Sequence, residues 1–199
     1  MSHPSTTRRV RKTPEQRRLD IADAARAVAL EGGLEAVTLR AVAARIGAAS
    51  GLVAHYTPSM DDLVASVFGE IVSAELREVI THLQGASTAR DRLGILLDTL
   101  LDGSRDDITL VWVQAWAVGA RNEPLAARVR AEMDAWQAAV AAEIQRGMDA
   151  GEFAPGDAAA IAWHILAMID GLSAHSLVRW NDAGARRSLA VRAALALLS

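Results

Sequence analysis

The side chains best suited to contact DNA lie between Thr38 and Tyr56. Thr38 and Ser50 carry hydroxyls that, together with the free amides at a helix start, can bind phosphate oxygens. Arg40 carries a forked guanidinium that fits the O6 and N7 atoms of guanine and can equally bind a phosphate. His55 and Tyr56 end in polar atoms suited to phosphates or base edges. These side chains predict a DNA-contacting surface.

Two further residues of this segment would lie against the bases. They are Gly51 and Leu52, and Leu52 can touch the methyl group of thymine. Structural explanations exist beside the functional ones: helix capping for the two hydroxyls, an ordinary surface position for Arg40, and partial burial for His55 and Tyr56. The residue types alone leave both explanations open.

The segment that carries these side chains has the pattern of two short helices separated by a turn. Thr38 is a good N-cap, and one helical face after it is apolar, formed by Leu39, Val42, Ala43 and Ile46. Gly47 can take the left-handed conformation that ends a helix. Ser50 is expected to cap the second helix, which ends before Pro58. Two such helices form a helix-turn-helix, whose second helix enters the DNA major groove.

Charge is unevenly distributed along the chain. The net charge is −3, but residues 1–60 hold nine basic and five acidic side chains, a net charge of +4, which leaves −7 for the rest. A positive head on a negative body confines attraction for DNA to one end. Residues 1–12 are expected to form a flexible basic arm, which either enters the adjacent minor groove or adds only diffuse attraction. Its basic residues are Arg8, Arg9, Arg11 and Lys12.

The remaining sequence is periodic in the manner of helices and shows no alternating strand pattern of useful length. Thr13 and Gln16 form a capping box for a first helix that ends at Gly32-Gly33. Ser59 begins a long fourth helix, which ends at Gly85. Further helices are expected at about 88–102, 105–120, 124–150, 158–180 and 183–198.

These patterns predict an all-α protein of about nine helices. The expected domains are the arm (1–12), a three-helix DNA-binding unit with the helix-turn-helix (13–58), and a larger bundle for ligand binding and dimerisation (59–199). The chain has no cysteine, which excludes disulfides and cysteine zinc sites and fits a reducing cytoplasm. No apolar run reaches the roughly 18 residues that span a bilayer, and no signal peptide is evident. We therefore expect a folded, soluble, cytoplasmic protein without a membrane partner.

All five tryptophans lie beyond residue 111, in the expected bundle. Trp112 and Trp116 are four residues apart and share one helical face. With Trp163 they could line an apolar cavity of the kind that binds small molecules. The aliphatic residues expected beside them are Leu96, Leu100, Met133, Leu166 and Met168. Aromatic faces attract quaternary ammonium groups, whereas plain core packing is the alternative for each tryptophan.

Two ionisable residues, His164 and Asp170, interrupt the apolar run 161–172. Because a buried ionisable group needs a partner, both are candidate ligand-binding residues. Asp170 would either pair with a cationic or hydroxylated ligand or bond to another helix. His164 and His175 would lie about 16 Å apart along a helix, too far to share a metal ion. Neither a phosphate-binding glycine loop nor a catalytic motif is present, so we expect no enzyme, metal or other cofactor.

The first third of the chain resembles the TetR family of bacterial repressors, which join a DNA-binding head to a ligand-binding body. The matching positions within residues 17–68 are Ile21, Ala24 or Ala25, Gly32-Gly33, Thr38, Ala43, Ile46-Gly47, Ser50-Gly51, His55-Tyr56 and Leu63. Segment 51–60 is most similar to the choline- and betaine-responsive subgroup, and segments 112–116 and 167–172 are similar to that subgroup's ligand domain. The resemblance implies a repressor that binds double-stranded DNA and is released by a small molecule.

Three positions depart from the family pattern. Thr57 stands where the family usually has a phenylalanine that packs the recognition helix, and Ala54 stands where many members have a phosphate-binding tyrosine. Met60 replaces a lysine that contacts a phosphate in the family. Because Met60 carries no charge, we expect one fewer ionic contact per half-site and a shallower salt dependence of DNA binding.

One short recognition helix reads too few base pairs, so we expect a homodimer on a palindromic operator with half-sites roughly 34 Å apart. The last two expected helices are the candidate interface, because 183–198 presents a small apolar face formed by Leu189, Ala193, Ala196 and Leu197. A monomer could instead use this face internally. The effector, expected to be cationic or apolar, would change the separation of the two recognition helices and lower DNA affinity by about 1–3 kcal/mol.

Two other functions remain compatible with the sequence. One is a DNA-binding regulator whose tryptophan-rich core binds no ligand. The other is a helical ligand-binding protein or enzyme with no role in DNA binding. A salt-sensitive, sequence-specific complex with DNA would distinguish the regulator from the second alternative.

Overall fold

A computed structural model describes residues 12–199, and every regular element in that range is helical. The N-terminal elements are α1 (Pro14–Gly32), the short 3₁₀ helix η1 (Leu34–Ala36), α2 (Leu39–Arg45) and α3 (Ser50–Tyr56). The remaining elements are α4 (Met60–Leu83), α5 (Ala89–Leu101), α6 (Asp106–Gly119), α7 (Glu123–Asp149), α8 (Ala158–Leu177) and α9 (Ala183–Leu197). The expected all-α fold is confirmed for the described residues.

Side-chain caps define the starts of α1 and α4, where the sequence predicted them. At α1, the Thr13 hydroxyl accepts from the Gln16 amide, and the Gln16 side chain accepts from the Thr13 amide. At α4, the Ser59 hydroxyl accepts from the Asp62 amide at 3.1 Å. Gly33 has φ +80° and ends α1, as a glycine can without steric cost. The expected starts of these helices are therefore confirmed.

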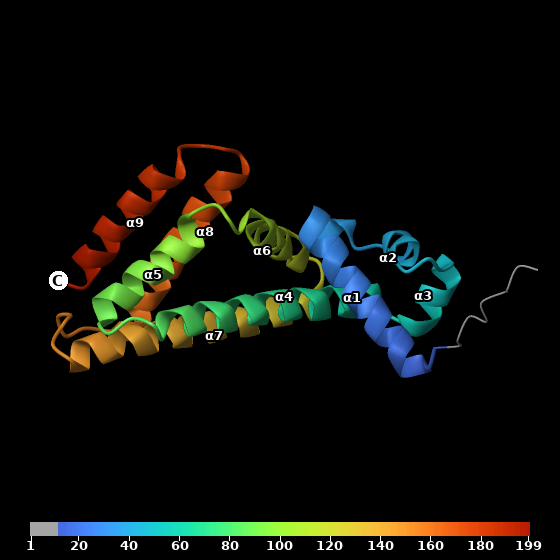
Figure 1. The fold of residues 1–199 in the computed structure, drawn as a ribbon, viewed down its shortest axis with the longest axis horizontal. Helices are drawn as coiled ribbons and strands as arrows, with labels where there is room; N and C mark the ends of the chain where they lie inside the picture. The colour runs from blue at the N-terminus through green and yellow to red at the C-terminus, as the bar shows by residue number, and fades with distance from the viewer. Residues whose placement is uncertain (1–11) are drawn as a thin grey trace, which may run out of the picture.

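The molecule is divided into a small head, formed by α1–α3, and a larger helical body (Figure 1). The long helix α4 starts beneath the head, packs against α1 and then runs along α7 through the body. Phe68, on α4, is fully buried, as are Val53 on α3 and Ile165 on α8. Because α4 packs in the core of the head and in the core of the body, a shift of its axis in the body would displace the head.

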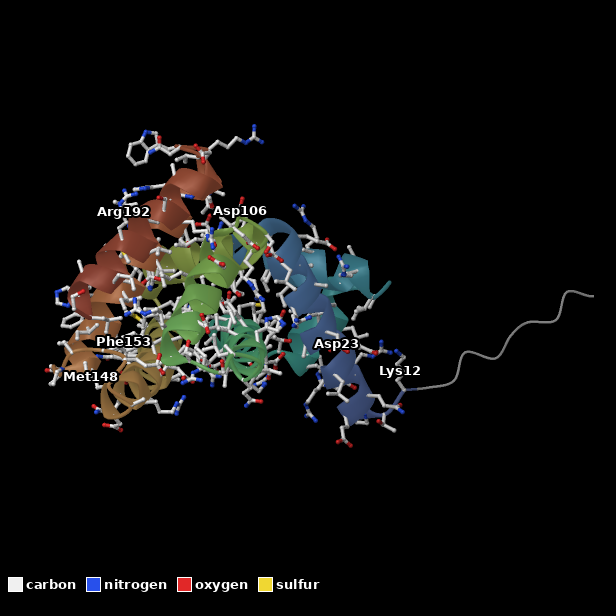
Figure 2. All side chains as sticks on the ribbon, turned by 60° about the vertical axis from the view of Figure 1, so that its left-hand side comes forward. Lys12, Asp23, Asp106, Met148, Phe153 and Arg192 are labelled. Atoms are coloured by element: carbon white, nitrogen blue, oxygen red, sulfur yellow. The ribbon has the colours of Figure 1, made fainter. Side chains whose placement is uncertain are left out.

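The far side of the body is closed by α8 and α9, which follow one another as an antiparallel pair (Figure 1). An ion pair between Arg187 and Asp98 fastens α9 to α5. The Ala154 amide donates to the Leu198 carbonyl at 3.0 Å and holds the end of the chain. Arg192 projects from α9 at the opposite side of the molecule from Lys12 and Asp23 (Figure 2).

Two details differ from the sequence-based expectation. The helix expected to end near residue 180 ends at Leu177, because Arg179 and Asn181 adopt left-handed backbone angles (φ 57° and 60°) and turn the chain into α9. The 3₁₀ turn η1 was not expected. It lets the chain reverse between α1 and α2 within a few residues.

The expectation that no segment could span a bilayer was also wrong by length and composition. The helix α8 is long and apolar enough to do so, although Asp170 lies within it and little of its surface is buried in a single chain. The core helix of a soluble protein passes the same test. A single chain therefore leaves an apolar side of α8 exposed to solvent.

Asn122 ties the start of α7 to the start of α4. Its side-chain oxygen accepts from the Leu125 amide at 2.9 Å, and its amide nitrogen donates to Asp61 at 3.0 Å. Asn122→Ala is expected to destabilise the protein by about 1–2 kcal/mol, because the buried Leu125 amide loses its acceptor. Urea denaturation measures this loss. Thr88→Ala, at the exposed cap of α5, should cost less, and an equal cost for both variants would contradict the argument.

Candidate functional site

The head contains a helix-turn-helix built from α2 and α3. Gly47 has φ +63°, so the expected left-handed turn after α2 is confirmed. The Ala48 amide then donates to the Ala43 carbonyl at 2.9 Å and redirects the chain into α3. Val53 is fully buried and anchors α3 to the head core. This leaves the opposite side of α3 free to approach a partner.

The predicted DNA-contacting residues are mostly at the surface of this unit. Arg40 is exposed, and no hydrogen bond or ion pair engages it within residues 12–199. The exposed residues of α3 are Ser50, Gly51, Ala54 and His55, whereas Leu52 and Tyr56 are half-buried. The exposed edge of the helix-turn-helix is therefore uncharged except at Arg40 and Arg45, and Arg45 is paired with Glu31 at 2.7 Å.

His55 and Tyr56 form a pair at the end of α3. Their rings meet edge to face with centroids 5.0 Å apart. The Arg18 guanidinium of α1 lies 5.9 Å from the centre of the Tyr56 ring. Tyr56 also packs against the head core, so both the structural and the DNA-contacting roles remain available to it.

Two details of the predicted surface need correction. Ser50 does not cap α3: Ala49 occupies the N-cap position, and no side chain bonds to the helix amides there. Lys12 does not extend freely, because its ammonium group bonds to both carboxylate oxygens of Asp20 at 2.7 Å. Thr38 caps α2 as expected, accepting from the Ala41 amide at 3.1 Å. Arg8, Arg9 and Arg11 of the predicted arm lie outside the described residues.

The body contains a cavity of about 560 Å³ bounded mainly by α6, α7 and α8, with Glu75 of α4 and Leu100 of α5 completing its wall. Its apolar wall consists mainly of Trp112, Trp116, Trp136, Trp163, Leu100, Val113, Met133, Leu166, Ala167 and Ile169. Its polar lining consists of Glu75, Arg105, Thr109, Arg130, Asp134, Gln137, Asp170 and Ser173. This volume lies within the range of sites that enclose small organic ligands.

Aromatic contacts hold the α6 wall of the cavity in place. The Trp112 and Trp116 rings lie 5.6 Å apart and tilted by 33°. The rings of Phe68, on α4, and Trp112 meet edge to face, with their centroids 5.0 Å apart. Trp136 is buried, and its indole N–H has no hydrogen-bond acceptor within the described part of the chain. A buried donor without a partner is costly, but this N–H has no accessible surface through which a molecule in the cavity would reach it.

Three carboxyl groups line the cavity, those of Glu75, Asp134 and Asp170, and two of them have a raised pKa. Burial raises the pKa of Glu75, on α4, to about 7, although Arg105 at 3.8 Å and the Trp112 indole N–H oppose the shift. Burial alone raises the pKa of Asp170, on α8, to about 6. Asp170 has no ion-pair or hydrogen-bond partner within residues 12–199. A ligand cation would supply the missing counter-charge.

The structure brings most of the predicted ligand-binding residues together. Trp112, Trp116, Trp163 and Asp170 line the cavity, as do Leu100, Met133 and Leu166. His164 does not line it. The expectation that His164 is buried was wrong, because its ring faces outward and contacts the Ala160 carbonyl of its own helix at 2.8 Å.

Two aliphatic residues expected in the lining, Leu96 and Met168, are also absent from it. Conversely, sequence reasoning missed Glu75, Arg105 and Trp136. A signal for Glu75 was present, because it falls one helical turn after Ile71 and one before Val79, on the buried face of α4.

Metal chemistry has no support in this part of the molecule. Within residues 12–199, no group of three or more His, Cys, Asp or Glu side chains is arranged to hold a metal ion.

The head and the cavity together define the architecture of a helical DNA-binding regulator with a ligand-binding body. Comparisons of sequence agree with it: the profile "Bacterial regulatory proteins, tetR family" matches residues 21–67, and "BetI-type transcriptional repressor, C-terminal" matches residues 89–198. The chain belongs to the TetR family, with a BetI-type C-terminal domain. It is therefore a transcriptional regulator and not an enzyme.

Individual relatives point the same way. The HTH-type transcriptional regulator BetI of Stenotrophomonas maltophilia is 30% identical over 105 residues, which are 51% of this chain and 53% of that one. The match thus spans about half the length of this curated relative.

Solved structures share the fold. A TetR-family protein from Rhodococcus sp. has a TM-score of 0.77 at 22% identity and covers 93% of this chain and 100% of its own. A protein from Saccharomonospora viridis, described as a transcriptional regulator and solved in complex with choline, has a TM-score of 0.78 at 24% identity, covering 88% and 94%. At these identities the likeness establishes the fold alone.

Proposed function

We propose that this protein is a cytoplasmic homodimeric repressor that binds a palindromic operator and is released from it by a small cationic effector. The effector would occupy the cavity between α4, α6, α7 and α8. The observation that carries the proposal is that Asp170, a partly buried carboxyl without a partner within residues 12–199, lines a cavity walled by tryptophans. Tryptophan faces and a carboxylate are the groups that bind quaternary ammonium ions.

Choline is the first effector to test. It is bound by the Saccharomonospora viridis structural neighbour, and this cavity offers groups for each part of it. Its trimethylammonium group suits the tryptophan walls and Asp170, and its hydroxyl can bond to the Thr109 hydroxyl, which lines the cavity. Betaine carries the same cation with a carboxylate, for which Arg105 and Arg130 are the arginines that line the cavity, although Arg105 is also paired with Glu78 at 2.9 Å.

Dimerisation is proposed to use the exposed sides of α8 and α9. Trp163 is 65% exposed on α8, and Leu189 and Leu197 are 49% and 40% exposed on α9. Small residues lie between these anchors, including Ala167 and Gly171, so that a second pair of helices can approach closely. A four-helix interface of this kind would cover the apolar side of α8 that a single chain leaves exposed.

We propose the functional division expected from the sequence, with residues 13–58 as the DNA-binding unit and 59–199 as the ligand-binding and dimerisation unit. In the dimer, α3 of each protomer would enter successive major grooves, with Thr38, Ser50 and the polar ends of α3 near the backbone. Gly51 and Leu52 would face the bases, and the basic N-terminal arm would reach the adjacent minor groove.

The decisive experiment is a binding measurement on the DNA upstream of the gene, with fluorescence anisotropy as the readout. We expect a sequence-specific complex that weakens with salt and dissociates when choline is added. A complex that forms but ignores choline, betaine and other quaternary ammonium compounds would favour a ligand-independent regulator. Absence of any sequence-specific complex would overturn the proposal.

Arg40→Ala is expected to weaken operator binding by about tenfold or more, because each protomer loses a charged contact. If Arg40 binds a phosphate, the slope of log affinity against log salt becomes shallower by about one unit per half-site. If it binds guanine, the slope changes less and the preference at one base pair is lost. Arg77→Ala, at an exposed arginine of α4, is the control and should change neither. Unchanged binding by Arg40→Ala would remove Arg40 from the interface.

A further inference from the structure

Helix α6 has two sides with different neighbours. Trp112, Val113 and Trp116 face the cavity. Gln114 lies about 200° around the helix from Trp112 and points the other way. It meets the head, where α6 lies beside the end of α1 and η1 (Figure 1). One short stretch of α6 thus contacts both the proposed effector site and the DNA-binding unit.

The contact between Gln114 and the head is close and polar. The Gln114 side-chain oxygen accepts from the Glu35 amide of η1 at 3.1 Å. The same carboxamide covers Gly33, where an added Cβ would collide with it, so the absence of a side chain at Gly33 makes the approach possible. Leu34, between these two residues, is almost fully buried in the head. Gln114 therefore contacts a segment of the head, residues 33–35, that the buried Leu34 side chain anchors.

The contacted segment leads directly into the helix-turn-helix. The Val37 amide donates to the Leu34 carbonyl at 3.1 Å, and Thr38 follows as the N-cap of α2. A displacement of η1 would therefore be passed to the start of α2 through a few hydrogen-bonded residues. This route is separate from α4, which connects the body to the head by chain continuity and packing.

We propose that Gln114 is a positioning residue that couples occupancy of the cavity to the orientation of the helix-turn-helix. This inference rests on the proposed function, since it explains how the effector site would act on DNA binding. An occupant that presses on Val113 or Trp116 moves α6, and Gln114 moves η1 with it. Coupling requires two sites that bias the same structural element, and here that element is α6 with η1.

The test needs neither DNA nor an effector, because bulk can be added to the cavity by substitution. Val113→Phe extends a ring from α6 into the cavity, in place of an occupant. Backbone hydrogen exchange at residues 33–37 is then measured in four proteins: wild type, Val113→Phe, Gln114→Ala and the double variant. We expect Val113→Phe to change exchange of the Glu35 amide by about threefold or more in the wild-type background, and by less than about 1.5-fold when Gln114 is alanine.

Further variants separate coupling from simple loss of a contact. Gln114→Glu keeps an acceptor for the Glu35 amide and should preserve the response to Val113→Phe. Gln114→Met keeps the volume without the acceptor, should abolish the response, and serves if the alanine variant folds poorly. Gln145→Ala removes a glutamine of α7 that bonds to Asp149 within its own helix, and it should leave the response intact.

Two results would overturn the proposal. One is an equal effect of Val113→Phe with and without Gln114, which would show that the signal travels elsewhere. The other is no effect of Val113→Phe at residues 33–37 in the wild-type background. Neither result bears on operator binding or its release by choline, so failure of this inference is distinguishable from failure of the proposed function.

Discussion

Asp170→Asn is expected to weaken choline binding by about 10- to 100-fold while leaving the fold intact, because the ligand cation loses a counter-charge that no other side chain within residues 12–199 pairs with. Asparagine has nearly the same shape as aspartate, so the tryptophan walls should be undisturbed. Glu75→Gln should have a smaller effect, because Arg105 at 3.8 Å already offsets the charge of Glu75. Titration of tryptophan fluorescence measures both affinities.

The pH dependence of binding provides an independent check on Asp170. A cationic ligand prefers the ionised carboxylate, and burial raises the pKa of Asp170 to about 6 and that of Glu75 to about 7. Choline affinity should therefore increase as pH rises from 5 and level off above about pH 8, where both carboxyl groups are ionised. In Asp170→Asn the part of this increase near pH 6 should disappear. Asp134, Arg105 and Arg130 also face the cavity and contribute a background common to both proteins.

A neutral ligand separates charge from shape. The compound 3,3-dimethylbutan-1-ol has the shape of choline without its charge, so Asp170→Asn should change its binding little. If Asp170→Asn bound choline as tightly as the wild type at pH 7.5, the ligand role of Asp170 would be wrong. The alternative, that Asp170 bonds to a neighbouring helix, would then be favoured.

Phe68→Ala is expected to cost about 3–5 kcal/mol of the free energy of unfolding, a large share of the roughly 5–15 kcal/mol available to a typical domain. Phe68 is fully buried on α4, and its ring supports Trp112 edge to face at 5.0 Å. Removing it leaves a cavity behind the α6 wall and takes away the stacking contact. The loss should appear as a lower urea midpoint at fixed protein concentration, since the proposed dimerisation would add to apparent stability.

The same substitution should also disturb the effector site. Without the Phe68 ring, Trp112 gains freedom, and the affinity for choline should fall together with stability. Leu19→Ala is the control, because Leu19 is 60% exposed on α1 and its removal should cost less than about 0.5 kcal/mol. A loss below about 1.5 kcal/mol for Phe68→Ala would indicate that the surrounding helices collapse to fill the space.

The head could be predicted from the sequence because its signals are local. The Thr38 and Ser59 caps are bonds to amides three residues ahead, and the left-handed turn at Gly47 depends on one residue type. Ser50 shows the limit of this reasoning. Serine is a common N-cap residue, but α3 begins one residue earlier than expected, so that Ala49 occupies the N-cap position. The path of the turn between α2 and α3 decided where α3 begins.

The cavity was predicted less completely because its lining comes from helices far apart in the sequence. Glu75 and Asp170 face the same space from α4 and α8, and nothing in either helix specifies that meeting. His164 and Asp170 interrupt the same apolar run, yet one points outward and the other into the cavity. Their difference is set by where α6 and α7 pack against α8, which is a property of the whole bundle.

The sequence by itself determined the helices, the caps at Thr13, Thr38 and Ser59, the helix-turn-helix and the family, because these depend on residue types at short and regular spacing. The tertiary structure alone decided which polar groups are buried without partners and which glutamine of α6 contacts the head. Burial and contact depend on how neighbouring helices are placed, and short-range spacing does not carry that information.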